Sequence, residues 1–479
     1  MAPRKKGPKK KGPKRMTTTK KPAAAKEQGP AFRAVRDRTL SLWQSAAEEV
    51  AARSAAPKAA AAGVVMAPRI AAADDAPALD LEAARALDRP AAATALAVAL
   101  AGEEPAAKAV APSLTAAVGG TIVECNKLAL QLAWAKARGD AQAVQQLQDS
   151  LNFSNCDPGW RETVEQFLLY FKWQHASIPY RSGGDYVLDY ELPANATIAI
   201  IGDWGTGTPT ALALLDQVAQ HNPQVIFHLG DIYYSGTPDE CQARFLAPCQ
   251  GLRDNGARVY TLSGNHDMYS GGVGYYWLVD KLEQQASYFC VHNEHWQFLA
   301  MDTGYSDYDP LPWLHSPSFP LDVSTPPSLT DVEGAWHADK IRQAGDRKTV
   351  LLSHHPAFTA YDPIAGQSTN TQLLKPFQGL LQDVALWFWG HEHRLAIYGS
   401  YADIERGRCV GCSAIPVFVR EDPYKVKYED VPVLPPMLGN NGDVYNRGYA
   451  IMQLDGPKAT VSYYQDSDGG NALYVEELG

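Results

Sequence analysis

TIAIIGDWG (197–205) is the stretch of sequence that decides the fold. It is an apolar run that ends in a Gly-Asp pair, and VIFHLGD (225–231) repeats this pattern further along the chain. Between the two, Thr208-Pro209 is a typical helix start and Asn222-Pro223 a typical helix stop. The region therefore predicts a strand, a helix and a second strand that form a β-α-β unit.

Three more apolar runs lead directly into polar residues. Val259–Leu262 precedes Gly264-Asn265-His266-Asp267, Val350–Leu352 precedes His354, and Val384–Trp389 precedes Gly390-His391-Glu392-His393. In an open α/β sheet the ligand crevice lies at the carboxyl edge of the strands, because the loops that leave that edge converge there. We therefore expect an α/β domain whose polar residues meet in one site.

The polar residues at these strand ends form a mixed oxygen and nitrogen ligand set. It consists of two aspartates, one asparagine and three histidines: Asp203, Asp231, Asn265, His354, His391 and His393. Such a set suits borderline first-row metals rather than calcium or a thiolate-bound structural zinc. Two metal ions can share it if one carboxylate bridges them.

The order of these motifs resembles that of the calcineurin-like metallophosphoesterases, over about residues 195–455. The motifs are Gly202-Asp203-Trp204-Gly205, Gly230-Asp231-Ile232-Tyr233-Tyr234, Gly264-Asn265-His266-Asp267, His354-His355-Pro356 and Gly390-His391-Glu392-His393. The family usually has a histidine where Gly205 stands, and the tyrosine three residues after Asp231 is similar to that of purple acid phosphatases. The resemblance implies a four-layer α-β-β-α sandwich of two mixed β-sheets. Periodicity alone indicates only an α/β domain with a C-terminal strand pair near Tyr449–Leu454 and Ala459–Tyr464.

The resemblance also implies a ligand set for two metal ions. Asp203, Asp231, Tyr234 and His393 would hold the first ion, and Asp231, Asn265, His354 and His391 the second. His354 is preferred to His355 because the family's ligand lies two residues before the proline. Tyr233 is the rival of Tyr234, with packing as its expected role. A phenolate is a hard ligand, so we expect Fe(III) paired with Zn, Mn or Fe(II).

The implied chemistry is hydrolysis of a phosphate ester by in-line attack of a metal-bound hydroxide. His266 would be the general acid, and Asn265, His266 and His355 would contact the substrate. Asp267 would either orient His266 or stabilise its turn, and His355 faces either the substrate or the sheet. Asp302-Thr303-Gly304 ends another apolar run, Phe298–Met301, and is expected to shape the substrate rim.

The expected function is that of a phosphomonoesterase of the acid phosphatase type. One alternative is a phosphodiesterase that acts on cyclic nucleotides or other diesters. A second alternative is a non-catalytic scaffold that binds partners through the N-terminal region, but the presence of every expected ligand argues against it. A nucleotide-binding loop formed by Gly202, Gly205 and Gly207 is rejected as an alternative. These glycines do not have the GxGxxG spacing, and Asp203 would repel a pyrophosphate.

The composition divides the chain into three parts. Residues 1–112 are rich in Lys, Ala and Pro and are expected to be disordered, residues 113–184 form a helical module, and residues 185–479 form the catalytic domain. The first 30 residues contain eleven Lys or Arg and one Glu, a net charge of +10. Because the net charge of the whole chain is −10, the remaining residues have a net charge of −20. Such a basic arm is either merely solubilising or able to contact nucleic acid, an anionic lipid surface or an acidic protein.

The seven cysteines are irregularly spaced, which favours reduced, buried thiols over a disulfide scaffold. Cys409 and Cys412 have the spacing of half a zinc site, but no second CxxC accompanies them and their neighbours alternate like a strand. No transmembrane run and no apolar segment of a secretory signal are visible, so the expected location is cytoplasmic. The oligomeric state is not predicted.

Overall fold

The computed structural model describes residue 163 and residues 166–173, 177–182, 186–310 and 326–479. The predictions for residues 1–112, and for most of the helical module at 113–184, therefore lie outside the described residues. Of that module the structure describes one short helix, η2 (Leu168–Trp173).

A six-stranded mixed sheet carries the first three sequence motifs. Its strand order is β16-β15-β14-β2-β3-β4, and β2, β3 and β4 are parallel neighbours. The strands are β2 (Asn195–Ile201), β3 (Val225–His228), β4 (Arg258–Thr261), β14 (Gly448–Asp455), β15 (Lys458–Gln465) and β16 (Ala472–Leu478). The antiparallel pair β14 and β15 confirms the predicted C-terminal strand pair.

An eight-stranded mixed sheet carries the two histidine motifs. Its order is β1-β5-β6-β7-β8-β10-β9-β11, with β6, β7, β8 and β10 parallel to one another. The strands are β1 (Asp189–Glu191), β5 (Phe289–His292), β6 (Trp296–Ala300), β7 (Lys348–Ser353), β8 (Val384–Trp389), β9 (Leu395–Tyr398), β10 (Gly407–Val410) and β11 (Val433–Leu434). A separate small hairpin joins β12 (Asn440–Asn441) and β13 (Val444–Tyr445).

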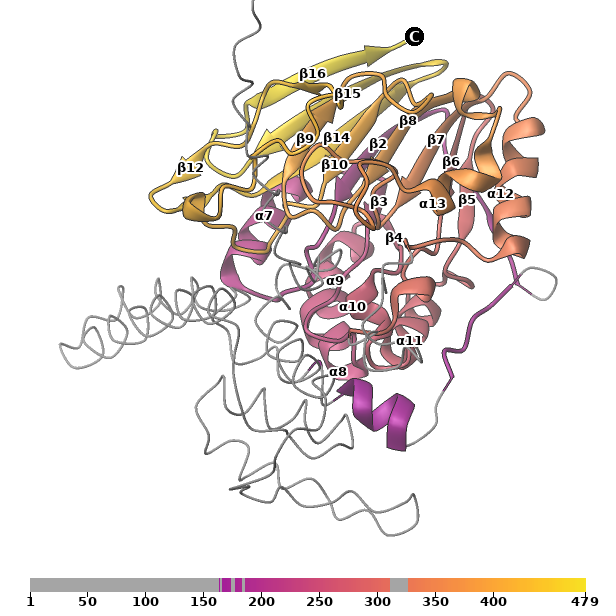
Figure 1. Cartoon of the computed structure of the whole chain (residues 1–479), viewed down its shortest axis with the longest axis vertical. Coiled ribbons are helices and arrows are strands. Elements are labelled where there is room, and N and C mark those ends of the chain that lie inside the picture. Colours follow the sequence, from indigo (N-terminus) through magenta and orange to yellow (C-terminus); the bar gives the residue numbers. More distant parts are fainter. Residues whose placement is uncertain (1–162, 164–165, 174–176, 183–185, 311–325) are drawn as a thin grey trace, which may run out of the picture. The chain divides into compact units, whose positions relative to one another are not determined.

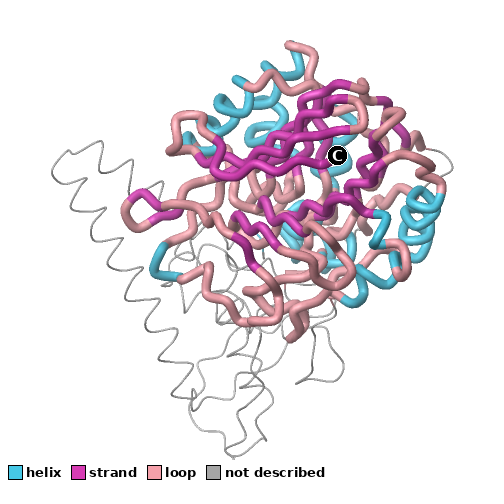
Figure 2. The backbone as a smooth tube through the Cα atoms, turned by 90° about the horizontal axis from the view of Figure 1, so that it is seen from above, coloured by secondary structure: helices cyan, strands magenta, loops and turns pink. Residues whose placement is uncertain are grey.

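The two sheets pack face to face, and helices cover their outer faces (Figures 1 and 2). Alternate residues of β2 show the layering, since Ile198 and Ile200 belong to the core between the sheets, whereas Ala199 and Ile201 face helices. The six-stranded sheet packs on α7 (Pro209–Gln220), η3 (Cys241–Leu246), α9 (Ala247–Asp254) and α11 (Val273–Lys281). The eight-stranded sheet packs on α12 (Asp331–Arg342) and α13 (Thr371–Leu374). This arrangement confirms the α-β-β-α sandwich.

Helix α7 shows how local sequence sets the β2-α7-β3 unit. The Thr208 side chain accepts a hydrogen bond from the Ala211 N–H, a cap that stabilises a helix by about 1 kcal/mol. Pro209 occupies the first turn, where no N–H is needed. The helix ends before Asn222, whose φ of 50° is left-handed, and β3 then runs parallel to β2. Both predicted helix boundaries are confirmed.

The remaining helices are short and lie in the loops that connect the main elements. They are α8 (Pro238–Glu240), α10 (Asn265–Met268), η4 (Tyr305–Asp307), η6 (Lys375–Phe377), η7 (Leu381–Asp383) and η8 (Val419–Glu421). No helix of the described part is both long and apolar enough to cross a membrane.

All five cysteines in the described ranges are free thiols and buried, as predicted. Cys409 lies in β10, and its Sγ faces the Arg394 carbonyl oxygen at 3.4 Å. Burial raises the pKa of the Cys409 thiol well above its ordinary value. A buried thiol in a strand fits the structural role that the sequence analysis favours.

Candidate metal centre

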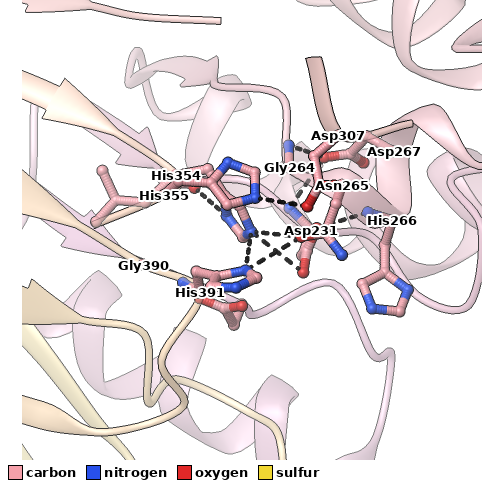
Figure 3. A network of polar contacts seen from close by, with 12 residues as sticks. Asp231, Gly264, Asn265, His266, Asp267, Asp307, His354, His355, Gly390 and His391 are labelled. Atoms are coloured by element: carbon pink, nitrogen blue, oxygen red, sulfur yellow. Dashed lines mark hydrogen bonds and ion pairs between the residues drawn. The ribbon is translucent and has the colours of Figure 1, made fainter. Parts of the chain in front are cut away.

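The carboxyl ends of strands from both sheets meet at one edge of the sandwich. Asp203 follows β2, Asp231 follows β3 and Asn265 follows β4, whereas His354 follows β7 and His391 follows β8 of the other sheet. The side chains of Asp231, Asn265, His354 and His391 point toward one another (Figure 3). The predicted residues thus converge, and they come from both sheets of the sandwich.

Three potential ligand atoms form a first close triangle. The Tyr233 hydroxyl lies 3.0 Å from Asp203 Oδ1 and 3.0 Å from His393 Nε2. Asp203 Oδ1 and His393 Nε2 are 3.3 Å apart. Neighbouring ligands of a metal with bonds of about 2.1 Å lie roughly 3.0–3.4 Å apart, so the triangle has the dimensions of one face of a coordination shell.

A second triangle lies beside the first. Asn265 Oδ1 is 3.0 Å from His354 Nε2 and 3.2 Å from His391 Nδ1, and the two ring nitrogens are 3.2 Å apart. Asp231 Oδ2 lies 3.5 Å from His354 Nε2. Asp203, Asp231 and His354 also bring one ligand atom each within 4.8 Å of one another, so Asp231 connects the two triangles.

Each aspartate is fixed by a backbone N–H from the neighbouring motif. The His391 N–H donates to Asp203 Oδ2 at 2.8 Å, and the His266 N–H donates to Asp231 Oδ1 at 3.0 Å. The second oxygen of each carboxylate faces the cluster. In each carboxylate, one oxygen is held by a backbone N–H and the other is directed toward the cluster, so the ligands are in place before any ion binds.

Glycines at the motif starts allow these close approaches. A Cβ added at Gly264 would lie 2.0 Å from Asp231 Oδ1, and one at Gly390 would lie 2.7 Å from Asp203 Oδ2. Side chains cannot occupy such positions without displacing the carboxylates. The glycines before Asn265 and His391 are therefore part of the geometry of the site.

Three of the candidate ligands have left-handed backbone conformations. The φ angles of Asp203, Asp231 and His391 are 56°, 75° and 65°. Left-handed residues other than glycine are uncommon, cost free energy, and gather at functional sites. Since all three stand two or three residues after the end of a strand, the sharp turns direct their side chains into the cluster.

The donor chemistry fits a cation. The Nδ1 of His354 faces the Leu229 carbonyl oxygen at 2.8 Å, so Nδ1 carries the ring proton and Nε2 presents a lone pair. That lone pair faces Asn265 Oδ1, a second acceptor, at 3.0 Å. Two acceptors at this distance repel each other unless a cation lies between them. Burial, followed by the nearby His355 and His391, lowers the pKa of His354 well below its ordinary value, which favours the neutral ligand form.

The structure differs from the sequence prediction at the tyrosine. Tyr233, expected to serve in packing, brings its hydroxyl to Asp203 and His393. The ring of Tyr234, the expected ligand, lies 5.1 Å from the Arg244 guanidinium. Motif spacing cannot reveal which of two adjacent tyrosines turns inward, because that depends on the backbone path of the loop.

His266 is buried beside the two triangles. Its Nδ1 lies 2.7 Å from the Tyr234 carbonyl oxygen, which accepts the ring N–H. Its ring contacts the rings of Tyr233 and Tyr269 at centroid distances of 4.5 and 4.8 Å. The ring proton of the neutral imidazole is therefore on Nδ1, and the general acid role of His266 stays a prediction.

Asp267 is hydrogen-bonded to the backbone of the loops that follow β3 and β4. Its carboxylate accepts backbone N–H bonds from Asp231, Ile232 and Gly264 at 2.8–3.1 Å. Burial raises the pKa of Asp267 to about 7, although these hydrogen bonds act in the opposite direction. Of its two predicted roles, these contacts match the turn-stabilising one.

His355 is held by two residues that the sequence analysis did not single out for this role. Its Nδ1 lies 3.0 Å from Thr303 Oγ1, and its Nε2 lies 3.2 Å from Asp307 Oδ2. Its ring is 4.5 Å from that of His391. Thr303 comes from the loop predicted to shape the substrate rim. The sequence gives no local signal that its hydroxyl would pair with His355. Substrate contact by His355 stays a prediction.

The family model described as calcineurin-like phosphoesterase matches residues 196–395, which include every predicted metal ligand. The match covers 200 of the 479 residues, so the similarity to the calcineurin-like phosphoesterase family lies in the central part of the chain.

Three solved structures illustrate the similarity. A purple acid phosphatase from yellow lupin seeds is 13% identical, with a TM-score of 0.42, over 60% of this chain and 55% of its own. A dimetal phosphatase from Danio rerio is 12% identical, with a TM-score of 0.39, over 59% and 98%. GAP50, the anchor in the inner membrane complex of Plasmodium, is 14% identical, with a TM-score of 0.37, over 60% and 89%. The chain thus spans about half the length of the lupin enzyme. Comparison with curated proteins found no match.

Proposed function

We propose that this protein is a binuclear metal-dependent hydrolase of phosphate monoesters. The observation that carries the proposal is the pair of adjacent triangles, Asp203-Tyr233-His393 and Asn265-His354-His391, with Asp231 between them. Each triangle offers three ligand atoms, and Asp231 is suited to bridge two ions. The preference for monoesters rests on the resemblance of the motifs to those of purple acid phosphatases.

In this proposal the residues divide into ligands and a proton donor. Two bound metal ions would supply a water of lowered pKa as nucleophile and would neutralise charge on the phosphoryl oxygens. Asn265 lies next to His266, so a phosphate held near Asn265 would also be near the imidazole. His266, protonated on both ring nitrogens with Nδ1–H held by the Tyr234 carbonyl, would donate its Nε2 proton to the leaving oxygen and become the neutral imidazole.

The tyrosine favours iron in the first position of the proposed centre. A phenolate beside Asp203 is a hard, anionic ligand and suits Fe(III), while the second triangle, with two imidazoles and an amide oxygen, suits a divalent ion. We therefore propose Fe(III) with Zn, Mn or Fe(II).

The experiment that tests the function compares substrates and metals together. Purified full-length protein is stripped with a chelator, reloaded with Fe and Zn or with Mn, and assayed on a nitrophenyl monoester, its bis-ester and cyclic nucleotides. We expect hydrolysis of the monoester that depends on about two metal ions per chain. A hundredfold preference for the diester would assign the protein to the phosphodiesterases, and metal binding without hydrolysis would favour the scaffold alternative.

A further inference from the structure

Two buried charged residues alternate with the candidate ligands His391 and His393 in the turn between β8 and β9. Glu392 lies between the two histidines and Arg394 follows them, and both side chains are buried. The histidine rings reach the two triangles, through His391 Nδ1 and His393 Nε2. The side chains of Glu392 and Arg394 instead contact residues 359–362.

The Glu392 carboxylate has a donor at each of its oxygens. Oε1 accepts a hydrogen bond of 2.5 Å from the Thr359 hydroxyl, whose oxygen in turn accepts the Tyr361 N–H at 2.9 Å. Oε2 faces the Trp389 indole N–H at 3.4 Å. The Arg394 guanidinium lies 3.7 Å from Oε1 and adds an ion pair. A buried carboxylate is therefore held from three directions.

These contacts join the two histidine motifs of the eight-stranded sheet. Thr359 and Asp362 lie in the loop that follows His354 at the end of β7. Arg394 Nη2 donates to Asp362 Oδ2, and its guanidinium stacks on the Tyr361 ring at 4.4 Å. Side chains that supply no atom to the triangles thus connect the turn after β8 to the loop after β7.

The backbone of the turn is held by other segments near both ends. The Gly390 N–H donates to the His354 carbonyl at 3.0 Å, and the Gly411 N–H donates to the Arg394 carbonyl at 3.2 Å. Glu392 lies midway between these points. Its side chain therefore adds an anchor in the middle of the turn.

His391 and His393 differ in their own support. The His391 N–H donates to Asp203 Oδ2 at 2.8 Å, so this residue is also fixed from within the cluster. His393 directly follows Glu392, and its Nε2 lies 3.3 Å from Asp203 Oδ1 in the first triangle. We propose that Glu392 is a positioning residue that holds the turn so that His393 completes the first metal position. The inference rests on the proposed metal centre but not on hydrolysis.

A purely stabilising role explains these buried charges less well. Taking a carboxylate and a guanidinium out of water is costly, and well-packed apolar residues in their place are often as stabilising or more so. A carboxylate that must meet Thr359, Trp389 and Arg394 together favours a single arrangement of the turn. Such an arrangement is what a ligand on the same turn requires.

The test measures metal affinity in the full chain. Chelator-treated wild-type and Glu392→Ala proteins are titrated with Mn²⁺ by calorimetry in competition with a chelator. We expect Glu392→Ala to bind one of its two ions about 10–100-fold more weakly. His393→Ala, which lacks the ligand itself, identifies that ion. Glu476→Ala is the matched control, because this carboxylate in β16 pairs with the buried Arg408, and it should bind both ions like the wild type.

Two substitutions of Thr359 separate positioning from packing. Thr359→Val removes the hydroxyl that donates to Glu392 but keeps the size of the side chain, and it should lose affinity for the same ion. Thr359→Ser keeps the hydroxyl and should retain wild-type affinity. If Glu392→Ala does not fold, this pair decides alone.

Three results would overturn the inference. They are wild-type affinity for both ions in Glu392→Ala, an equal loss in Glu476→Ala, and equal affinities in Thr359→Val and Thr359→Ser. Wild-type protein that binds two ions but hydrolyses no phosphate ester would overturn the proposed function and leave this inference standing.

Discussion

The hydroxyl of Tyr233 donates a 3.0 Å hydrogen bond to Asp203 Oδ1. This contact joins the loop after β3 to the loop after β2, and His393 Nε2 completes the group at 3.0 Å from the same hydroxyl. A phenol beside a carboxylate and an imidazole would release its proton to one of these groups or to water when a metal ion binds its oxygen. The neighbouring Tyr234 has its ring beside Arg244.

The first prediction compares these adjacent tyrosines. Fe(III)-loaded wild-type protein should absorb visible light through phenolate charge transfer, and Tyr233→Phe should abolish this band. Tyr234→Phe, the matched control, should keep it. Visible spectra at equal iron content check the prediction. A band that survives in Tyr233→Phe and disappears in Tyr234→Phe would restore the assignment made from the motif spacing.

The second prediction concerns Asp231 as the bridge. Asp231→Asn removes a negative charge from the position between the two triangles, so the protein should lose at least one of its two metal ions. Metal analysis after gel filtration measures the loss. Asp216→Asn, at an exposed position on α7, is the control and should retain both ions. Full occupancy in Asp231→Asn would exclude the bridging assignment.

The third prediction concerns the glycine before Asn265. In Gly264→Ala the new methyl group would lie 2.0 Å from Asp231 Oδ1, so the carboxylate must move out of its position. We expect metal affinity to fall at least about tenfold, as for other losses of ligand support. Gly251→Ala is the control, because nothing lies within 4 Å of its added Cβ. Unchanged metal affinity in Gly264→Ala would mean that the site has more room than the structure indicates.

Much of this site could be predicted from the sequence because strand ends are local features. An apolar run that stops at a polar residue marks the end of a buried strand, and Asp203, Asp231, Asn265, His354 and His391 all follow that rule. The β-α-β unit and the C-terminal strand pair could also be predicted from the sequence. Helix caps, prolines and the alternation of apolar and polar residues are patterns that extend over only a few residues.

The remaining features depend on contacts between distant segments. Periodicity does not reveal that β2 and β3 belong to one sheet and β7 and β8 to the other, because both kinds of strand are buried runs. The inward turn of Tyr233, and the pairing of His355 with Thr303 and Asp307, depend on loop paths across a wide sequence separation. Such contacts leave no local pattern.

The fourth prediction concerns His266 as the proton donor. His266→Ala should retain both metal ions, because none of the ligand atoms in the two triangles belongs to it. Loss of a general acid slows turnover by about 10²–10⁴, and most for leaving groups of high pKa. Rates for a series of aryl and alkyl monoesters give the dependence. An equal loss across the series would remove His266 from the acid role.

The fifth prediction concerns two buried carboxyl groups away from the metal ligands. Glu333 on α12 accepts hydrogen bonds from the Asp302 N–H at 2.7 Å and from the Tyr180 hydroxyl at 2.8 Å. Burial raises the pKa of Glu333 from 4.5 to about 8. Burial, followed by the charge of Glu333, raises the pKa of Asp302 to about 6. The folded protein therefore keeps protons that the unfolded chain releases.

This difference makes the folded state less stable as the pH rises. The contribution from Glu333 is fully present below pH 4.5 and is lost as the pH rises to about 8, because the unfolded state ionises first. Glu333→Gln keeps an acceptor for the Asp302 N–H but cannot ionise. At pH 8.5 the metal-free variant should therefore melt above the wild type, by roughly 2–4 °C for each kcal/mol, and the difference should shrink toward pH 4.5. Thermal melts of both proteins across this pH range measure the difference, and Glu429→Gln, at an exposed position, is the control. If the wild type and Glu333→Gln lost stability in parallel as the pH rises, the raised pKa of Glu333 would be wrong.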